Sequence, residues 1–521
     1  MKRIIGFIFI GVIATTTSCK KYLDINQDPN NATSATPELI LPQAITGTAA
    51  NINGFNSYGA QLTGFMANAG GYGGFGTSIT YNFSSGDFAG RWSTTYDNLE
   101  DYQAIINKTD GDATYSYFNA AARIMRALSF QLLVDAYNDV PYTEALKGAD
   151  NLTPAYTDAK SIYEDLASEL DKAIAAINTG HTTPGVVELN GSDVLFHGNV
   201  DKWKQFANTL KLRILIHGFG KATFANSNFD PVGFLDKDAL INPGYRRDNG
   251  RQSPKWDSWG FSATGSDANK AWMPNIFVFS FYNGTKLVDD GRGAALYYHF
   301  PGGTGTNRLG VESNSLVSSP SGSFWYPSDN RDGKTAGAAT GALKGPEAGM
   351  PVITAAESYF LQAEGVLKGI IQTGDDAALF NEGIAASFDY LYQLPDGTHA
   401  VDPAADVATY LSDNDASYLV NYSLAASPEQ KLEAIITQKY IALNFVNSDE
   451  AWNEYRRTHY PAINNDAGAT GIETFASSVS QSTRPDHLPT RILYPTNEGA
   501  YNSTNVPKNI SPFTSTIFWA Q

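Results

Sequence analysis

The sequence has 521 residues, a formal net charge of −17, 42% hydrophobic and 17% charged residues, and a single cysteine. This composition excludes a disordered chain, which would combine low hydrophobicity with high charge, and one cysteine cannot form a disulfide within the chain. The acidity is unfavourable for nucleic-acid binding, because that affinity depends on phosphate neutralisation by Lys and Arg. We therefore expect a folded protein that is stabilised by packing and does not bind nucleic acid.

The first 19 residues have the layout of an export signal. Lys2 and Arg3 form a short basic start, residues 4–14 are an unbroken apolar run, and small residues precede Cys19. This run is typical of a secretory signal, since about 18 or more apolar residues are needed to cross a bilayer. A cysteine in this place resembles the lipobox of bacterial lipoproteins. We expect residues 1–18 to be removed and Cys19 to carry lipid; the alternative is an ordinary signal with an incidental cysteine.

A polar segment rich in Asn, Thr, Ser and Pro follows, and it predicts a lipidated tether over residues 19–38. We expect residues 39–521 to form a single domain. Helical periodicity or capping signals mark six segments of that domain: 121–137, 161–177, 201–219, 354–371, 375–391 and 427–443.

Small polar residues precede three of these predicted helices. The predicted helix starts are Ser161 with Glu164 as a capping box, Thr354 with Glu357, and Ser427 before Pro428. The helices fall into sequence-adjacent pairs, which favours αα-hairpins that stack as in tetratricopeptide-like solenoids. The predicted fold is therefore mainly α, with a helix-pair scaffold at about 39–220 and 351–460.

The pattern changes between about 221 and 350, where the chain predicts a loop-rich, partly β insertion for ligand binding. Residues 276–282, IFVFSFY, are typical of a short strand. Half of the eight tryptophans lie in this region: Trp256, Trp259, Trp272 and Trp325. The segment 461–521 is also irregular.

Aromatic residues in irregular segments are the candidate ligand-binding residues. A glycine-rich stretch at 64–76 carries Tyr72 and Phe75, and loops of this kind often expose aromatics for binding. The full candidate set is Tyr72, Phe75, Trp256, Trp259 and Trp325. An indole can cover the apolar face of a sugar ring, but the tryptophans can equally fill a second small core. Trp272 precedes an apolar run and is the weaker candidate.

Sequence motifs for catalysis are absent: the chain has no GxSxG elbow, no HExxH zinc helix and no phosphate-binding loop. The seven histidines are scattered without metal-ligand spacing, so we expect no metal site and no cofactor, and a structural metal ion stays open. Arg456 and Arg457 lie close to Glu450 and Glu454, a pattern that predicts pairing on a helix surface. A glycoside hydrolase stays open as the enzyme alternative, because 53 acidic residues offer many pairs.

Five segments in chain order resemble the SusD/RagB family, and the second SusD-like subfamily most of all. They are YLDINQDPN after Cys19, NDVPYTEAL (138–146), FHGNVDKWKQFANTLKLR (196–213), AESYFLQAEG (356–365) and the run from 438 to 461 with DEAWNEYRRTHYP. The resemblance covers essentially the whole chain after Cys19. One departure is Asp290-Gly291-Arg292, where the family has Asp-Pro-Arg.

The resemblance implies a nutrient-binding lipoprotein on the surface of the outer membrane, without catalytic activity of its own. It also implies a partner, a SusC-like TonB-dependent barrel on which the lipoprotein sits as a lid. The ligand implied is an oligosaccharide. A peptide cargo for the same kind of transporter stays open, because a barrel partner does not dictate the ligand.

Overall fold

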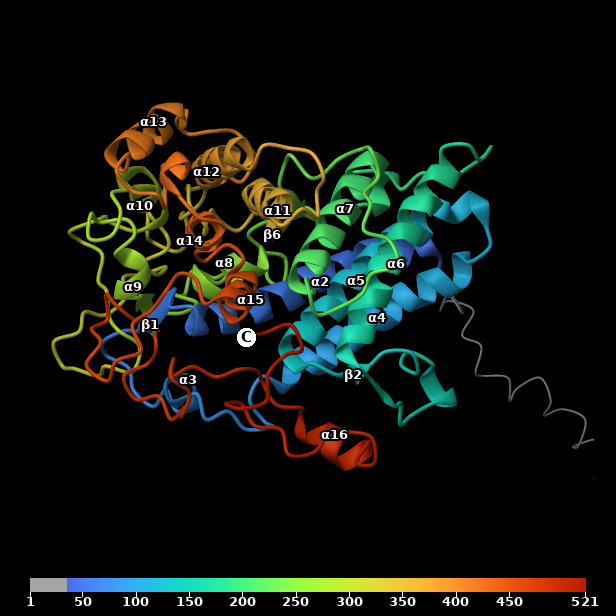
Figure 1. Cartoon of the computed structure of the whole chain (residues 1–521), viewed down its shortest axis with the longest axis horizontal. Helices are drawn as coiled ribbons and strands as arrows, with labels where there is room; N and C mark the ends of the chain where they lie inside the picture. Colours follow the sequence, from blue (N-terminus) through green and yellow to red (C-terminus); the bar gives the residue numbers. More distant parts are fainter. Residues whose placement is uncertain (1–34) are drawn as a thin grey trace, which may run out of the picture.

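The structure, a computed structural model, describes residues 35–521. The predicted signal, the lipid-bearing Cys19 and all but the end of the tether lie outside the described residues. The chain is mainly helical, as predicted, and the larger helices gather in two groups that are separated in sequence by the predicted insertion (Figure 1).

The first group of helices precedes the insertion. It comprises α2 (Pro37–Leu62), α3 (Thr77–Thr80), α4 (Ala89–Thr109), α5 (Ser116–Tyr137), α6 (Ala159–Gly180) and α7 (Val200–His217), with the 3-10 turns η1 (Ala113–Tyr115), η2 (Gly148–Asp150) and η3 (Asn190–Ser192). Sequence neighbours pack on one another from α4 through α7, and α2 packs on α4 and α5. This is the helix-pair stacking of a tetratricopeptide-like scaffold.

The second group follows the insertion. It comprises α11 (Ala355–Leu367), α12 (Asp376–Tyr392), α13 (Ala404–Asp413), α14 (Pro428–Leu443), α15 (Ser448–Thr458) and α16 (Thr496–Tyr501), with the 3-10 turn η4 (Tyr422–Leu424). Helix α11 joins the groups by packing on α7, and α15 packs on α2. A Cβ at Gly59 would lie 2.4 Å from the backbone oxygen of Ser448, so only glycine allows α2 to approach α15 this closely.

Polar side chains begin several helices, and three predicted starts can be compared with the structure. Thr354 accepts a hydrogen bond from the backbone of Glu357, and Ser427 accepts one from Gln430, so both predicted N-caps are confirmed. The capping box at Ser161 is wrong. Helix α6 begins two residues earlier, and the carboxylate of Asp158 accepts the hydrogen bond from the Ser161 backbone instead.

The insertion holds short helices and strands between long loops. Its helices are α8 (Pro254–Trp259), α9 (Ile276–Phe279) and α10 (Asp290–Leu296). The strands within residues 35–521 form three antiparallel pairs: β1 (Met66–Asn68) with β5 (Trp272–Pro274), β2 (Val140–Pro141) with β3 (Tyr156–Thr157), and β4 (Ala239–Ile241) with β6 (Met350–Ile353). The predicted strand at 276–282 is wrong, because the side chain of Asn275 caps a helical turn there.

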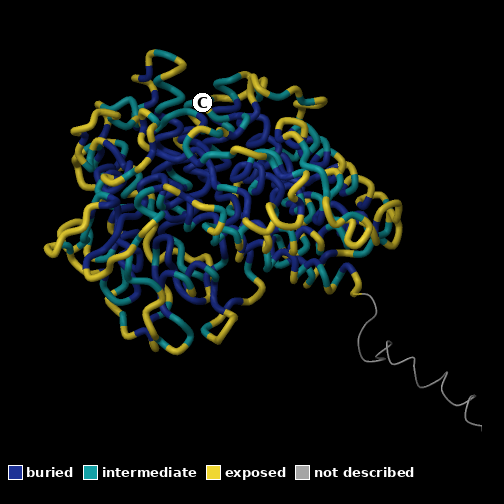
Figure 2. Tube along the Cα trace, turned by 90° about the horizontal axis from the view of Figure 1, so that it is seen from below, coloured by how far each residue is buried: buried dark blue, intermediate teal, exposed yellow. Residues whose placement is uncertain are grey.

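One hydrophobic core runs through both helical groups and the insertion. Figure 2 shows buried stretches through the middle of the molecule, with exposed stretches on the outer loops. The last residues return to this core: Trp519 is buried, and its indole nitrogen donates a 3.0 Å hydrogen bond to Asp135 of α5. Across residues 35–521, no helix combines the length and apolar character that a membrane span requires.

Candidate functional site

The three candidate tryptophans are buried, so none of them offers an exposed ring to a ligand. Trp256 and Trp325 have no exposed surface, and Trp259 is 6% exposed. The rings of Trp259 and Trp325 meet edge to face, and both contact Phe445, which follows α14. Large aromatic rings gain most by leaving water, and here they join the insertion to the helical scaffold. They therefore fill core, as the alternative predicted, but that core is continuous with the core of the helical scaffold and is not a second one.

The two aromatics of the glycine-rich loop differ. Phe75 is partly buried, with its ring edge-on to Trp272 at a centroid distance of 5.2 Å. Tyr72 is 46% exposed. Among the predicted ligand residues, Tyr72 therefore offers the most exposed ring.

Tyr72 lines a groove with a volume of about 540 Å³. One wall is the glycine-rich loop that follows β1, and the other is the loop from 312 to 316. The lining residues are Asn68, Ala69, Gly70, Gly71, Tyr72, Glu312, Ser313, Asn314 and Leu316. We refer to this feature as the loop groove.

Backbone hydrogen bonds hold the two walls of the loop groove together. The pairing of β1 with β5 continues as Ala69 N–H donates to the oxygen of Ala271 at 2.8 Å, and Gly70 N–H donates to the oxygen of Val317 at 2.9 Å. A Cβ at Gly70 would lie only 2.1 Å from the Leu316 oxygen. Gly70 is therefore the residue that permits this approach.

Asn68 fixes the floor of the loop groove. Its side-chain nitrogen donates to the oxygen of Val311 at 2.9 Å, and its side-chain oxygen accepts from the backbone of Gly310 at 2.9 Å. Asn307 adds a 2.9 Å hydrogen bond to the oxygen of Asn68. Because its side-chain nitrogen and oxygen both bond within the protein and the residue is only 1% exposed, Asn68 positions the walls instead of contacting a ligand.

Glu312 and Asn314 differ from Asn68, because their side chains are exposed and form no hydrogen bond or ion pair within residues 35–521. An exposed aromatic ring beside free polar groups is the usual composition of a ligand site. Sequence reasoning missed Glu312 and Asn314. They lie about 240 residues from Tyr72, and no local pattern distinguishes them from other loop residues.

A second cavity, of about 390 Å³, lies between α11, α12 and α13 and is acidic. Burial raises the pKa of Asp238 there to about 6, and its carboxylate accepts a 2.8 Å hydrogen bond from the backbone of Ala355. Asp389 is engaged by His399 at 2.8 Å and by Gln393 at 2.7 Å. Much of the polar lining is thus satisfied within the protein, unlike that of the loop groove.

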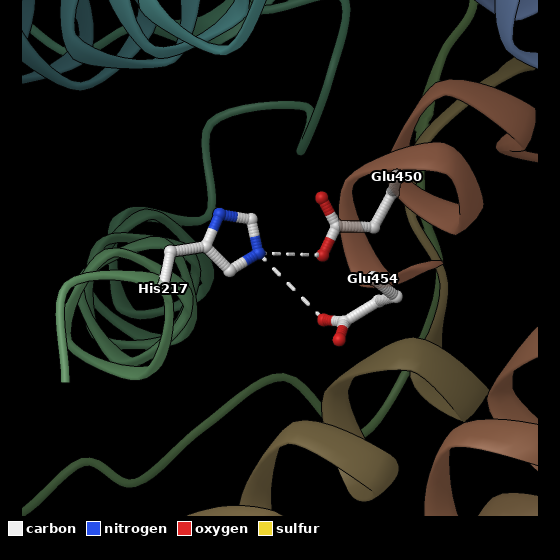
Figure 3. A group of neighbouring side chains, drawn as sticks. All are labelled: His217, Glu450 and Glu454. Carbon is white, nitrogen blue, oxygen red and sulfur yellow. Dashed lines mark hydrogen bonds and ion pairs between the residues drawn. The ribbon is translucent and has the colours of Figure 1, made fainter. Parts of the chain in front are cut away.

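The described residues also bring together one buried group with metal-ligand chemistry, His217, Glu450 and Glu454 (Figure 3). The histidine comes from the end of α7 and both glutamates from α15. His217 Nε2 lies 3.2 Å from Glu450 Oε1 and 3.6 Å from Glu454 Oε1. Sequence spacing could not reveal this group, since more than 230 residues separate the histidine from the two glutamates.

Lys439 occupies the position that a metal ion would need. Its ammonium nitrogen lies 2.9 Å from Glu450 Oε1 and 2.8 Å from Glu454 Oε1, the same two atoms that face His217. A zinc ion would sit about 2 Å from those oxygens, directly against the ammonium charge. The residues therefore do not fit a metal ion, and they form a buried salt-bridge cluster.

Burial and charge act against each other on the ionisable groups of this cluster. Burial alone would lower the pKa of His217, but Glu450, Glu454 and Asp135 outweigh it and raise that pKa to about 9. Burial alone would raise the pKa of Glu450, yet Lys439 and His217 hold it well below its usual value. The charged forms of both His217 and Glu450 are therefore favoured.

Arg457 pairs with Glu454, as predicted, but Arg456 and Arg457 are buried, so the predicted position on a helix surface is wrong. Arg457 donates two 2.7 Å hydrogen bonds to the carboxylate of Glu364 on α11. Arg456 donates a 2.8 Å hydrogen bond to the backbone oxygen of Asp135. Both arginines thus connect α15 to other helices, and their chemistry is structural.

Comparison with known proteins supports this architecture. A family model described as "Starch-binding associating with outer membrane" matches residues 29–227, and one described as "Susd and RagB outer membrane lipoprotein" matches residues 336–515. No curated protein sequence gives a significant match.

Solved structures share the fold over nearly the whole chain. A SusD homologue from Bacteroides fragilis is 21% identical, covering 94% of this chain and 100% of its own, with a TM-score of 0.66. A SusD homologue from Bacteroides uniformis is 22% identical, covering 92% and 99%, with a TM-score of 0.67. A chitin-binding SusD homologue from Flavobacterium johnsoniae is 22% identical, covering 92% and 98%, with a TM-score of 0.67. Matched by family models at both ends and by these folds throughout, the chain belongs to the SusD/RagB family.

Proposed function

We propose that this protein is a lipid-anchored outer-membrane lipoprotein that captures an oligosaccharide in the loop groove and delivers it to a SusC-like TonB-dependent barrel. The observation that carries the proposal is the groove itself, where the exposed ring of Tyr72 stands beside the free side chains of Glu312 and Asn314. Family membership and a chitin-binding relative support the choice of a glycan.

The chemistry of the loop groove suits a sugar. A pyranose has an apolar face of C–H groups, which a tyrosine ring can cover, and hydroxyls at its edge. The free carboxylate and amide can accept hydrogen bonds from those hydroxyls, and the amide can donate as well. A tyrosine suits such a contact, because its ring is apolar and its hydroxyl can stay in water.

The anchor follows from Cys19 at the predicted cleavage point. One acyl chain gives only reversible membrane binding and a second makes it stable, since each buried CH₂ contributes about 0.8 kcal/mol. Replacing Cys19 with Ala should therefore release folded protein from the membrane fraction. Retention of that variant in cells lacking the barrel would contradict lipid anchoring.

The barrel partner is tested by isolating the native protein from membranes. A permanent complex buries about 2,000 Å² or more, so the two proteins should co-purify. Recovery as a free monomer only, under conditions that keep the anchor intact, would contradict the partnership.

One experiment tests two alternatives to the proposed function. A peptide could occupy the loop groove, and a glycoside hydrolase would use the acidic cavity, where the pKa of Asp238 is raised to about 6 as a general acid requires. The purified protein is titrated with oligosaccharides and with peptides, and the sugar solutions are then analysed for cleavage. Sugar binding without cleavage is expected. Peptide binding alone, or cleavage that is lost in Asp238→Asn, would replace the proposal with the corresponding alternative.

A further inference from the structure

The charge of the loop groove indicates which sugars it accepts. Glu312 is the only charged residue among those that line it. We infer that the loop groove selects neutral and amine-bearing oligosaccharides against acidic ones, and that Glu312 sets this selectivity. The inference rests on the proposed function, because it names the ligand class of the same site.

The carboxylate of Glu312 is available to a ligand. It is exposed, lies on the wall opposite Tyr72, and makes no hydrogen bond or ion pair within residues 35–521. A carboxylate is an acceptor only, so its ligand must supply O–H or N–H donors. An amino sugar can donate a charge-assisted hydrogen bond from its ammonium group to this carboxylate. A neutral sugar can donate an ordinary hydrogen bond from a hydroxyl to the same oxygen.

The two cations that lie close in sequence to these walls do not line the loop groove, and both side chains bond elsewhere. Arg308, which precedes the 312–316 loop, donates to the backbone oxygens of Ala476 and Ala469. Lys270, which precedes β5, lies 3.5 Å from the carboxylate of Asp267. A uronate or sulfate in the loop groove would therefore face Glu312 without a compensating charge from the lining.

The charge of the whole chain acts in the same direction. At −17, the protein repels anions at long range and attracts cations, and this part of the effect is screened by salt. The repulsion between Glu312 and a bound anion is screened less by salt, because the ligand displaces the water between the two charges.

The test uses three hexasaccharides that differ in charge: N-acetylglucosamine (neutral), glucosamine (cationic) and galacturonate (anionic). Each is titrated calorimetrically into the purified protein and into Glu312→Gln at low and moderate ionic strength. Glu188→Gln is the matched control, because Glu188 is exposed in the loop after α6 and does not line the loop groove. Both variants remove one negative charge from the whole molecule.

The native protein should bind the neutral and cationic hexamers and bind galacturonate at least tenfold more weakly. Glu312→Gln should reduce the preference for the cationic over the neutral hexamer by about five- to tenfold, and Glu188→Gln should leave it unchanged. Equal binding of all three hexamers, or an equal effect of both variants, would overturn the inference while leaving sugar capture intact. Failure of every hexamer to bind, with peptides binding instead, would overturn the proposed function and the inference together.

Discussion

The indole ring of Trp325 lies parallel to the ring of Phe445, with 4.2 Å between the ring centroids and 5° between their planes. Trp325 belongs to the insertion, and Phe445 lies between α14 and α15 of the scaffold. Both side chains are buried. The stacked pair therefore joins two parts of the chain that the sequence pattern separates. The role of Trp325 is thus structural.

Replacing Trp325 with Ala should lower the free energy of unfolding by about 3–5 kcal/mol, because a large buried ring is lost and a cavity remains. Denaturant unfolding measures this change. Tyr72→Ala is the control, and its surface ring, which is 46% exposed, should contribute about 0.5 kcal/mol or less. A loss at Trp325 no larger than that at Tyr72 would contradict the assignment of Trp325 to the core.

Lys439 is the second residue whose removal should be costly. Its ammonium neutralises two buried carboxylates, so Lys439→Met should destabilise the protein by about 3–5 kcal/mol. Lys172→Met is the matched control. That lysine also pairs with a glutamate, but its side chain is 58% exposed, and its loss should cost about 1 kcal/mol or less. Unfolding midpoints for the two variants compare a buried with a surface ion pair directly.

If Lys439→Met were as stable as the native protein, the carboxylates of Glu450 and Glu454 would have another compensating group. A metal ion in the vacated position would be one such group, and adding a chelator would then lower the stability of the variant. The cluster as described predicts no effect of a chelator on the native protein.

The raised pKa of His217 predicts how stability depends on pH. Its folded pKa of about 9 lies above the usual value of 6.5, so the stabilisation is complete below about pH 6.5 and is lost as pH rises through about 9. The shift corresponds to about 3 kcal/mol. The unfolding free energy of the native protein should therefore fall relative to that of His217→Gln between pH 7.5 and 9.5.

That range avoids the titration of Asp449, and comparing the two proteins cancels the buried groups that titrate in both, Lys255, Lys286 and Lys344, whose pKa burial lowers to about 7. Burial raises the pKa of Asp449 to about 7, so its contribution to stability changes between about pH 4 and 7 and is nearly constant above that. Equal slopes for the native protein and His217→Gln above pH 7.5 would contradict a protonated His217 in the folded state.

The helical scaffold could be predicted because its signals are local. Each N-cap, at Thr354 and Ser427, and each apolar stripe, in α6 and α14, is a pattern among residues only a few positions apart. The insertion could not be predicted in the same way. At 276–282 an apolar run is compatible with either a strand or a helix, and one side-chain cap, Asn275, decides between them.

The loop groove could be predicted only in part, because its two walls are distant in sequence. Tyr72 is conspicuous in a glycine-rich stretch. Glu312 lines the groove only because Gly70 and Leu316 approach each other closely in the fold. Composition also cannot say whether a tryptophan in a loop-rich segment is exposed. Trp256 and Trp325 are buried because they join the one core that the insertion shares with the helical scaffold.

The most direct test of the central claim is a calorimetric titration of Tyr72→Ala with the N-acetylglucosamine hexamer, or with whichever oligosaccharide the native protein binds best. Tyr501→Ala is the matched control, since Tyr501 is 78% exposed on α16 and does not line the loop groove. If the loop groove captures the sugar, Tyr72→Ala should weaken binding by about 2 kcal/mol or more, and Tyr501→Ala should leave it unchanged. Unchanged affinity in a folded Tyr72→Ala protein would contradict the account and place the ligand elsewhere on the molecule.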